Sequence, residues 1–162
     1  MDIQARLIDS PTGWQAQLRD VISSADELLA ALGLSREDLY YSAAADRDFP
    51  LKVPRAFVRR MRRGDPRDPL LLQVLADQRE LVPAAGYSRD PVGETGAANP
   101  EPGIIHKYHG RVLLVVAAGC AVNCRYCFRR HFPYADNNNS RQQWQDALDY
   151  VLARPEITEV IL

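Results

Sequence analysis

Three cysteines lie within one eight-residue stretch, and this cluster limits what the chain can be more than any other feature of its sequence. Cys120, Cys124 and Cys127 are the only cysteines among 162 residues. An odd, clustered set cannot form the dispersed bridges of a secreted scaffold, whereas clustered thiols in a reducing compartment serve metal or redox chemistry. The cluster therefore predicts a metal or redox site in place of a disulfide framework.

The composition is that of an ordinary soluble domain, with 46% hydrophobic and 25% charged residues. A net charge of -1 argues against nucleic acid or membrane surfaces as partners of the whole molecule. No apolar run approaches the roughly 20 residues that span a bilayer. The first residues, MDIQARLIDSPTGW, lack the basic, apolar, small-residue order of a signal peptide. We therefore predict a cytoplasmic protein.

The first half of the chain reads as a series of short helices over residues 1–82. Ser24 and Glu27 have the spacing of a capping box, and Gly33 would end the helix that they begin. Pro54 and Pro69 suit the first turns of two further helices. Other expected helical positions are a face formed by Trp14, Leu18, Val21 and Ile22 and a helix start at Ser35. We expect these helices to form one N-terminal lobe.

A basic run within this lobe has two interpretations. It consists of Lys52, Arg55, Arg59, Arg60, Arg62 and Arg63. Such runs can contact phosphates, but more often they form the solvated face of a helix. Because Asp65 and Asp68 follow at once and offset the charge, we favour the solvated face.

The second half has a different pattern after a connector over residues 83–103, where proline and glycine break every periodicity. Residues 112–118 form a continuous apolar run that suits a strand buried on both faces. Ser140 and Gln143 form a capping box for an amphipathic helix that ends before Pro155. Residues 158–162 begin a second buried strand. Residues 104–162 therefore predict an α/β fold that starts with one βαβ unit.

The spacing CxxxCxxC follows the first predicted strand directly. A four-iron cluster ordinarily takes four thiolates, so three would leave one iron open. The amino and carboxylate groups of S-adenosylmethionine can fill that position. Tyr126, directly before the last cysteine, would give the cluster apolar cover. A [4Fe–4S] cluster is the preferred interpretation; a structural zinc site of the same cysteines with His131 is the alternative.

The motif CxxxCxφC, with Tyr126 at the aromatic position φ, resembles the signature of the radical S-adenosylmethionine superfamily. Longer stretches are similar to the lysine 2,3-aminomutase family, and within it to the bacterial branch that serves β-lysylation of elongation factor P. These stretches are DPVGE at 90–94, EPGIIHKYHGRVLLVV at 101–116 and CAVNCRYCFRRHFPY at 120–134. The resemblance extends to the helical lobe and implies that residues 104–162 begin a partial (β/α) barrel.

The resemblance also implies roles for individual residues. Cys120, Cys124 and Cys127 match the ligands of the cluster. In the family, this cluster binds S-adenosylmethionine. Arg129 matches the arginine that holds the carboxylate of the substrate L-lysine, a task that suits a planar guanidinium. The family also has basic and aromatic residues near the phosphate of pyridoxal 5'-phosphate. The residues that match them here are Lys107, Tyr108 and Arg111. The family has arginine where this chain has Lys107.

The family reaction converts L-α-lysine to (R)-β-lysine, which a separate ligase attaches to elongation factor P. Family members carry a glycine-rich turn and the lysine that anchors pyridoxal phosphate beyond the positions matched here. We therefore expect this chain to be an N-terminal portion that is inactive alone. Two alternatives are another radical reaction on the same scaffold and a zinc-stabilised module that binds RNA through the basic run.

Overall fold

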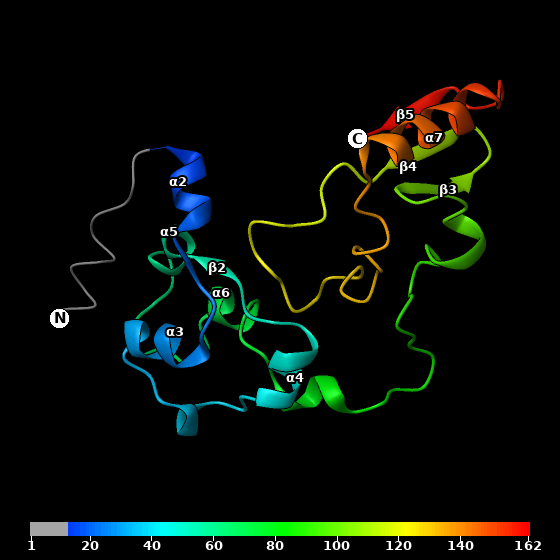
Figure 1. The fold of residues 1–162 in the computed structure, drawn as a ribbon. Coiled ribbons are helices and arrows are strands. Elements are labelled where there is room, and N and C mark those ends of the chain that lie inside the picture. Colours follow the sequence, from blue (N-terminus) through cyan, green and yellow to red (C-terminus); the bar gives the residue numbers. More distant parts are fainter. Residues whose placement is uncertain (1–12) are drawn as a thin grey trace. The chain divides into compact units, whose positions relative to one another are not determined.

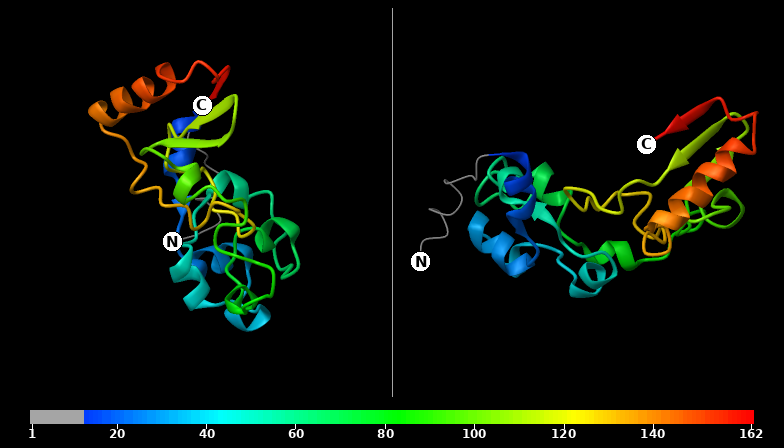
Figure 2. Two further views of the ribbon diagram at one scale, coloured as in Figure 1. Left: turned by 90° about the vertical axis from the view of Figure 1, so that its right-hand side faces the viewer. Right: turned by 45° about the horizontal axis from the view of Figure 1, so that its top comes forward.

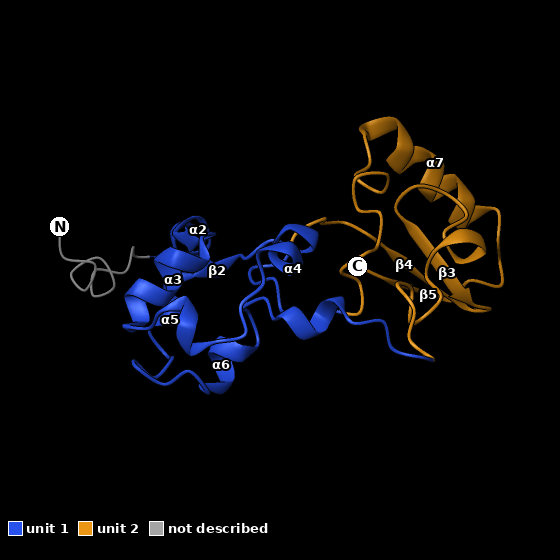
Figure 3. Cartoon of the chain, turned by 90° about the horizontal axis from the view of Figure 1, so that it is seen from below, with its two compact units in different colours: residues 1–85, 120–127 blue, residues 86–119, 128–162 orange. Residues whose placement is uncertain are grey.

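The computed structural model describes residues 13–162 (Figure 1). The chain divides into two compact units (Figure 3). Unit 1 takes in the described residues up to Ala85 together with Cys120–Cys127, and unit 2 consists of Gly86–Gly119 and Phe128–Leu162. The predicted limits of the helical lobe, the connector and the α/β part remain predictions. Most of the segment inspected for a signal peptide lies outside the described residues.

Unit 1 consists of short elements joined by tight turns. In chain order they are α2 (Trp14–Arg19), β1 (Val21–Ile22), α3 (Ala25–Leu32), η1 (Arg36–Asp38), α4 (Ala43–Asp48), β2 (Val53–Pro54), α5 (Arg55–Val58), α6 (Pro69–Leu72) and η2 (Gln78–Leu81). The strands β1 and β2 pair antiparallel, with Ile22 opposite Val53. Within residues 13–162, no helix is both long enough and apolar enough to cross a membrane.

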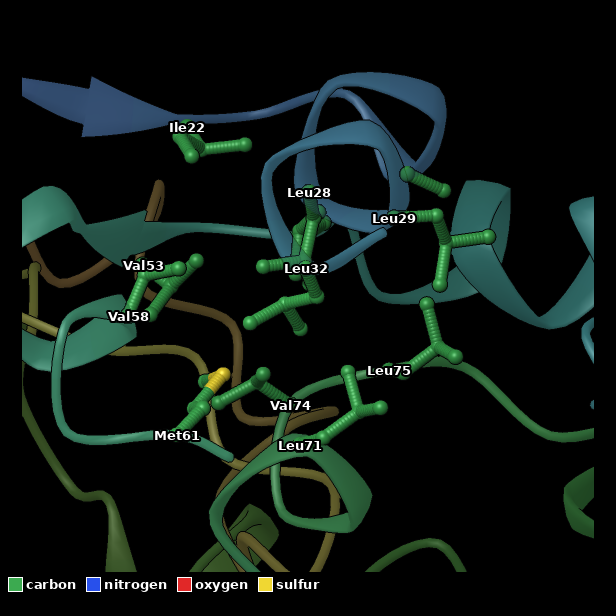
Figure 4. Close-up of a cluster of buried hydrophobic side chains, with 12 residues drawn as sticks. Ile22, Leu28, Leu29, Leu32, Val53, Val58, Met61, Leu71, Val74 and Leu75 are labelled. Carbon is green, nitrogen blue, oxygen red and sulfur yellow. The ribbon is translucent and has the colours of Figure 1, made fainter. Parts of the chain in front are cut away.

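One hydrophobic core holds unit 1 together (Figure 4). Leu28 and Leu32 from α3 meet Leu71 from α6, and all three side chains are at most 1% exposed. The other labelled members are Ile22, Leu29, Val53, Val58, Met61, Val74 and Leu75. Burial of such side chains, at about 1.5–3 kcal/mol each, gives these short helices the stability that their length alone cannot provide.

The sequence predicts both ends of α3, but not the side-chain interactions at its start. The helix starts after Ser24 and stops at Gly33, whose φ of 69° is the left-handed conformation that glycine adopts readily. The Ser24 side chain makes no capping hydrogen bond. Glu27 instead forms an ion pair with Arg55, so the predicted capping box is wrong at this position.

Four other predicted helices are shorter than expected. The helix at Trp14 ends at Arg19, and Ile22 is buried in a strand, because its pairing with β2 replaces the helical face. Ser35 caps only a 3₁₀ turn. The helices that were expected to start at Pro54 and Pro69 are four residues each, and Pro54 is the cap residue of α5.

The basic run does not form one solvated face. Arg55 is 9% exposed and pairs with Asp20 at 3.1 Å. Asp68 is 2% exposed and accepts backbone N–H groups of Leu70, Leu71 and Arg62. Burial raises the pKa of Asp68, but these hydrogen bonds outweigh burial and lower the pKa. Asp68 therefore caps α6, and its charge also acts on Arg62 of the basic run. The exposed members are Arg59, Arg60, Arg62 and Arg63.

Unit 2 is built on a small mixed sheet. Its elements are η3 (Gly96–Ala98), β3 (Ile104–Tyr108), β4 (Arg111–Leu114), α7 (Arg141–Leu152) and β5 (Glu159–Ile161). The sheet has the order β3-β4-β5; β3 and β4 pair antiparallel, whereas β4 and β5 pair parallel. Helix α7 connects the two parallel strands and lies beside them (Figure 2), where Ala147 is fully buried against Ile104 and Val112.

The mixed α/β class and the parallel βαβ connection are confirmed, and the partial barrel stays a prediction. The α7 capping box is also confirmed, since Ser140 and Gln143 each accept the other's backbone N–H group. The predicted buried strand at 112–118 is wrong in length, because β4 ends at Leu114. β3 was not predicted. β5 is largely exposed, with Val160 at 45%, so the expectation of a buried second strand is also wrong.

Candidate functional site

The three cysteines lie on an open loop that follows β4. All three thiols are free; Cys120 is exposed, and Cys124 and Cys127 are half-buried. The N–H group of Cys127 donates to the carbonyl of Cys124 at 3.0 Å, which forms a tight turn between them. Partial burial raises the pKa of the Cys124 thiol, and the nearby thiols of Cys127 and Cys120 raise it further.

The donors of this loop fit an iron–sulfur cluster in kind and in number. Three thiols from one eight-residue segment, none of them in a disulfide, match a cluster with three protein ligands. Within the described part of the chain, no three Cys, His, Asp or Glu side chains are grouped closely enough to hold a metal ion. The ligand assignment of Cys120, Cys124 and Cys127, and the zinc alternative with His131, therefore remain predictions.

The two residues between Cys124 and Cys127 have different surroundings. The Arg125 side chain is 7% exposed and pairs with Glu80 at 2.7 Å. Tyr126 is 71% exposed, and its hydroxyl donates to Oε1 of Gln73 at 3.3 Å. The predicted role of Tyr126 as apolar cover remains a prediction.

A cavity in unit 2 gathers the other predicted site residues. Its volume is about 320 Å³. The four residues that were expected to contact substrate or pyridoxal phosphate all line it: Lys107, Tyr108, Arg111 and Arg129. Its remaining lining is formed by Val92, Glu94, Ile105, Leu113, Phe128 and Ile161. The strands β3 and β4 and the segment after the cysteine loop thus bring the four predicted residues together, although Lys107 and Arg129 lie 22 positions apart in the sequence.

Arg129 is fixed by a two-pronged ion pair with Glu94. Its Nε donates to Oε2 of Glu94 at 2.6 Å, and its Nη2 donates to Oε1 at 2.7 Å. The Glu94 side chain is 12% exposed and that of Arg129 is 27% exposed, so the pair is largely screened from water. Glu94 therefore sets the plane of the guanidinium in the cavity.

Glu94 itself is positioned by a turn that starts at Asp90. The Asp90 carboxylate accepts the N–H groups of Glu94 and Thr95, each at 2.9 Å, and the Thr95 hydroxyl at 2.6 Å. The Thr95 hydroxyl contributes most to lowering the pKa of Asp90 to about 2. The stretch DPVGE thus forms a turn that directs Glu94 towards Arg129.

The three remaining site residues lie at the exposed turn end of the β3–β4 hairpin. Arg111 pairs with Glu159 of β5, and the Lys107 ammonium group donates to the carbonyl of Val92. The Lys107 Nζ also lies 5.9 Å from the centre of the Tyr108 ring. The cavity therefore carries three cationic side chains, of which two already have a carboxylate partner.

Sequence reasoning did not assign roles to Glu94 and Arg125. Glu94 is the last residue of the stretch DPVGE, but no pattern in the neighbouring sequence indicates that its partner, Arg129, lies 35 positions away. For Arg125, the available signal was its place between two cysteines. An arginine in such a tight loop needs a charged or hydrogen-bonding partner elsewhere in the chain.

The chain is similar to proteins named L-lysine 2,3-aminomutase. It is 52% identical to the one from Escherichia coli over 149 residues, which cover 91% of this chain and 43% of that protein. It is 47% identical to the one from Haemophilus influenzae over 158 residues, covering 98% and 46%. The protein from Buchnera aphidicola is 40% identical over 150 residues, covering 92% and 44%. No protein-family model matches the chain.

The matched region extends through both units, because it includes at least nine tenths of the chain in each of these comparisons. The chain spans less than half the length of the curated relatives that it matches. In sequence, the chain resembles the lysine 2,3-aminomutase family over nearly its whole length, in a manner consistent with an N-terminal portion of such a protein.

Proposed function

We propose that the chain is the N-terminal portion of a radical S-adenosylmethionine L-lysine 2,3-aminomutase, which converts L-α-lysine to (R)-β-lysine. The observation that carries this proposal is the common cavity of Lys107, Tyr108, Arg111 and Arg129. These are the residues that the resemblance assigns to substrate and pyridoxal phosphate. Similarity to proteins named L-lysine 2,3-aminomutase also supports this reaction.

Within this proposal, Arg129 binds the carboxylate of L-lysine with a guanidinium whose plane Glu94 has already set. Lys107 and Arg111 attract the phosphate of pyridoxal phosphate, and Tyr108 lies beside them. Apolar lining from Ile105 and other strand residues lowers the local dielectric, which strengthens both charge interactions.

Cys120, Cys124 and Cys127 are the proposed ligands of a [4Fe–4S] cluster, and Tyr126 would border the same site. When bound, the cluster and S-adenosylmethionine supply the radical that removes a hydrogen atom from the substrate, and pyridoxal phosphate carries the amino group that migrates. The chain's own contribution is to hold three thiolates on one loop and to orient the substrate.

We further propose that the product modifies elongation factor P through a separate lysine ligase, and that the protein works in the cytoplasm. This part rests on the resemblance of residues 90–134 to the branch that serves β-lysylation. The chain by itself is proposed to be inactive, because its relatives are more than twice as long as the region matched.

The cofactor part of the proposal is tested by anaerobic reconstitution of the chain with iron and sulfide. We expect about four irons and four sulfides per chain and a broad absorbance near ~400 nm. Cys124→Ala should abolish stable iron binding, because it removes one of three ligands, whereas Ser23→Ala, at an exposed serine of the same unit, should bind iron as the wild type does. Bound zinc without labile sulfide would favour the zinc module, and full iron content in Cys124→Ala would contradict the ligand assignment.

The reaction is tested with the polypeptide of the whole reading frame that contains this chain. The reconstituted protein is supplied with L-lysine, S-adenosylmethionine, pyridoxal phosphate and a reductant, and β-lysine is measured by chromatography. Formation of β-lysine is the expected result. Cleavage of S-adenosylmethionine without β-lysine would point to another radical reaction on the same scaffold.

A further inference from the structure

The cysteine loop is packed on the helical elements of unit 1. Cys120–Cys127 belong to unit 1 by their contacts (Figure 3). Val122 packs against the hydrophobic core of that unit. The helical unit is therefore in direct contact with the segment that carries all three thiols.

Backbone groups of the loop are tied to unit 1 at several points. The N–H of Asn123 donates to the carbonyl of Lys52 at 3.0 Å, and the N–H of Arg125 donates to the carbonyl of Gln73 at 2.7 Å. The Asn123 side chain donates to the carbonyl of Pro50 at 2.9 Å. The Lys52 ammonium group donates to the carbonyl of Cys120 at 2.8 Å. These contacts hold the loop from its first cysteine to the residue after its second.

Arg125 makes the most extensive of these contacts. Its Nε and Nη2 donate to the two oxygens of Glu80 at 2.9 and 2.7 Å, and Nη2 also donates to the carbonyl of Ala45 at 3.1 Å. Its Nη1 donates to the carbonyl of Phe49, whose ring centre lies 5.3 Å from the guanidinium carbon. Glu80 is held in turn, because its Oε1 accepts the N–H of Asp77 at 2.9 Å.

We propose that the helical unit is the platform of the cofactor site and that Arg125 is its positioning residue, which holds Cys124 and Cys127 in place through Glu80. The buried guanidinium cannot leave its site without giving up the Glu80 charge and two backbone carbonyl partners, so the backbone on both sides of it is confined. Arg125 directly follows Cys124 and lies two positions before Cys127, so its position sets where both thiols point. This inference rests on the proposed role of the loop in cluster binding.

The test compares Arg125→Ala, Arg125→Lys and Glu80→Gln with the matched control Arg60→Ala, whose arginine is exposed in the same unit. Each chain is reconstituted anaerobically, and iron and sulfide are measured per folded molecule, together with the electron paramagnetic resonance spectrum and the rate of cluster loss in air. Folding of the iron-free chains is followed separately by circular dichroism.

We expect Arg125→Ala and Glu80→Gln to bind several-fold less iron per folded chain and to lose it several-fold faster, with an altered spectrum. Arg125→Lys should lie between them and the wild type, because a lysine can pair with Glu80 but cannot reach all the carbonyl partners. Arg60→Ala should match the wild type. Folded Arg125→Ala with wild-type iron content, spectrum and cluster lifetime would overturn the proposal.

A second measurement does not depend on the variants or on iron. In the wild-type iron-free chain, the amides of Asn123 and Arg125 should exchange slowly with deuterium, because both donate to carbonyls of the platform. Fast exchange at both amides in a folded chain would also overturn the inference. If the wild type shows slow exchange but takes up no iron, the platform stands and the proposed cofactor fails.

Discussion

At the scale of single residues, two arginines near the proposed sites are each held by a carboxylate partner. Arg129 and Arg125 lie four positions apart, and each is paired with a glutamate through two hydrogen-bonding nitrogens. Arg129 points its charge into a cavity, while Arg125 is removed from solvent and anchors the loop. A buried guanidinium is stabilised only where its donors are satisfied, which is why both glutamates matter.

Glu94→Gln should weaken the proposed binding of L-lysine about tenfold. The amide loses the charge and one acceptor, so Arg129 is no longer held in one plane; hydrogen bonds to charged groups contribute about 1.5–3 kcal/mol, and 1.4 kcal/mol corresponds to tenfold. In the protein of the whole reading frame, KM for lysine should rise. Glu101→Gln, an exposed glutamate in the same unit, should leave KM unchanged. An unchanged KM in Glu94→Gln would speak against this role.

At the scale of elements, short helices and turns depend on side-chain caps. Ser140 and Gln143 define the start of α7, and Asp68 does so for α6. Such caps are local, and sequence spacing reveals the first of them directly. The turn that starts at Asp90 works in the same way, because one carboxylate there accepts two backbone N–H groups.

The Asp90 turn should be lost in acid. Because its pKa is lowered from 3.8 to about 2, the stabilisation by Asp90 is complete above pH 3.8 and disappears as pH falls through about 2. The Thr95 amide signal in nuclear magnetic resonance spectra should follow that titration. In Asp90→Asn no carboxylate titrates, so the same signal should stay flat across this range. A wild-type midpoint near pH 4 would contradict the assigned hydrogen bonds.

At the scale of the whole molecule, the core of the helical unit also supports the cysteine loop. Helix α3 contributes several side chains to this core, and Val122 of the cysteine loop packs against it. Loss of core packing should therefore affect the thiols as well as the fold.

Leu28→Ala should destabilise the chain by about 2–5 kcal/mol, because Leu28 is fully buried and its truncation leaves a cavity. Leu72→Ala, at a side chain that is 49% exposed, should change stability by only about 0.5 kcal/mol. Urea unfolding measures both values. The three thiols should also react faster with a thiol reagent in Leu28→Ala than in Leu72→Ala. Equal stability of the two variants would refute the assigned core.

The sequence alone determined the features that depend on near neighbours. The cysteine spacing, both ends of α3, the start of α7 and the strand–helix–strand order are set by residues within a few positions of one another. The resemblance carried by residues 90–134 also needed only the order of residues.

Only the tertiary structure decided which distant groups meet. It paired Arg129 with Glu94 across 35 positions and Arg125 with Glu80 across 45, and it joined the cysteine loop to the helical unit. It also shortened the strand at 112–118 and placed β3 beside it. These outcomes depend on burial and charge pairing between remote segments, and no local pattern encodes which segments come together.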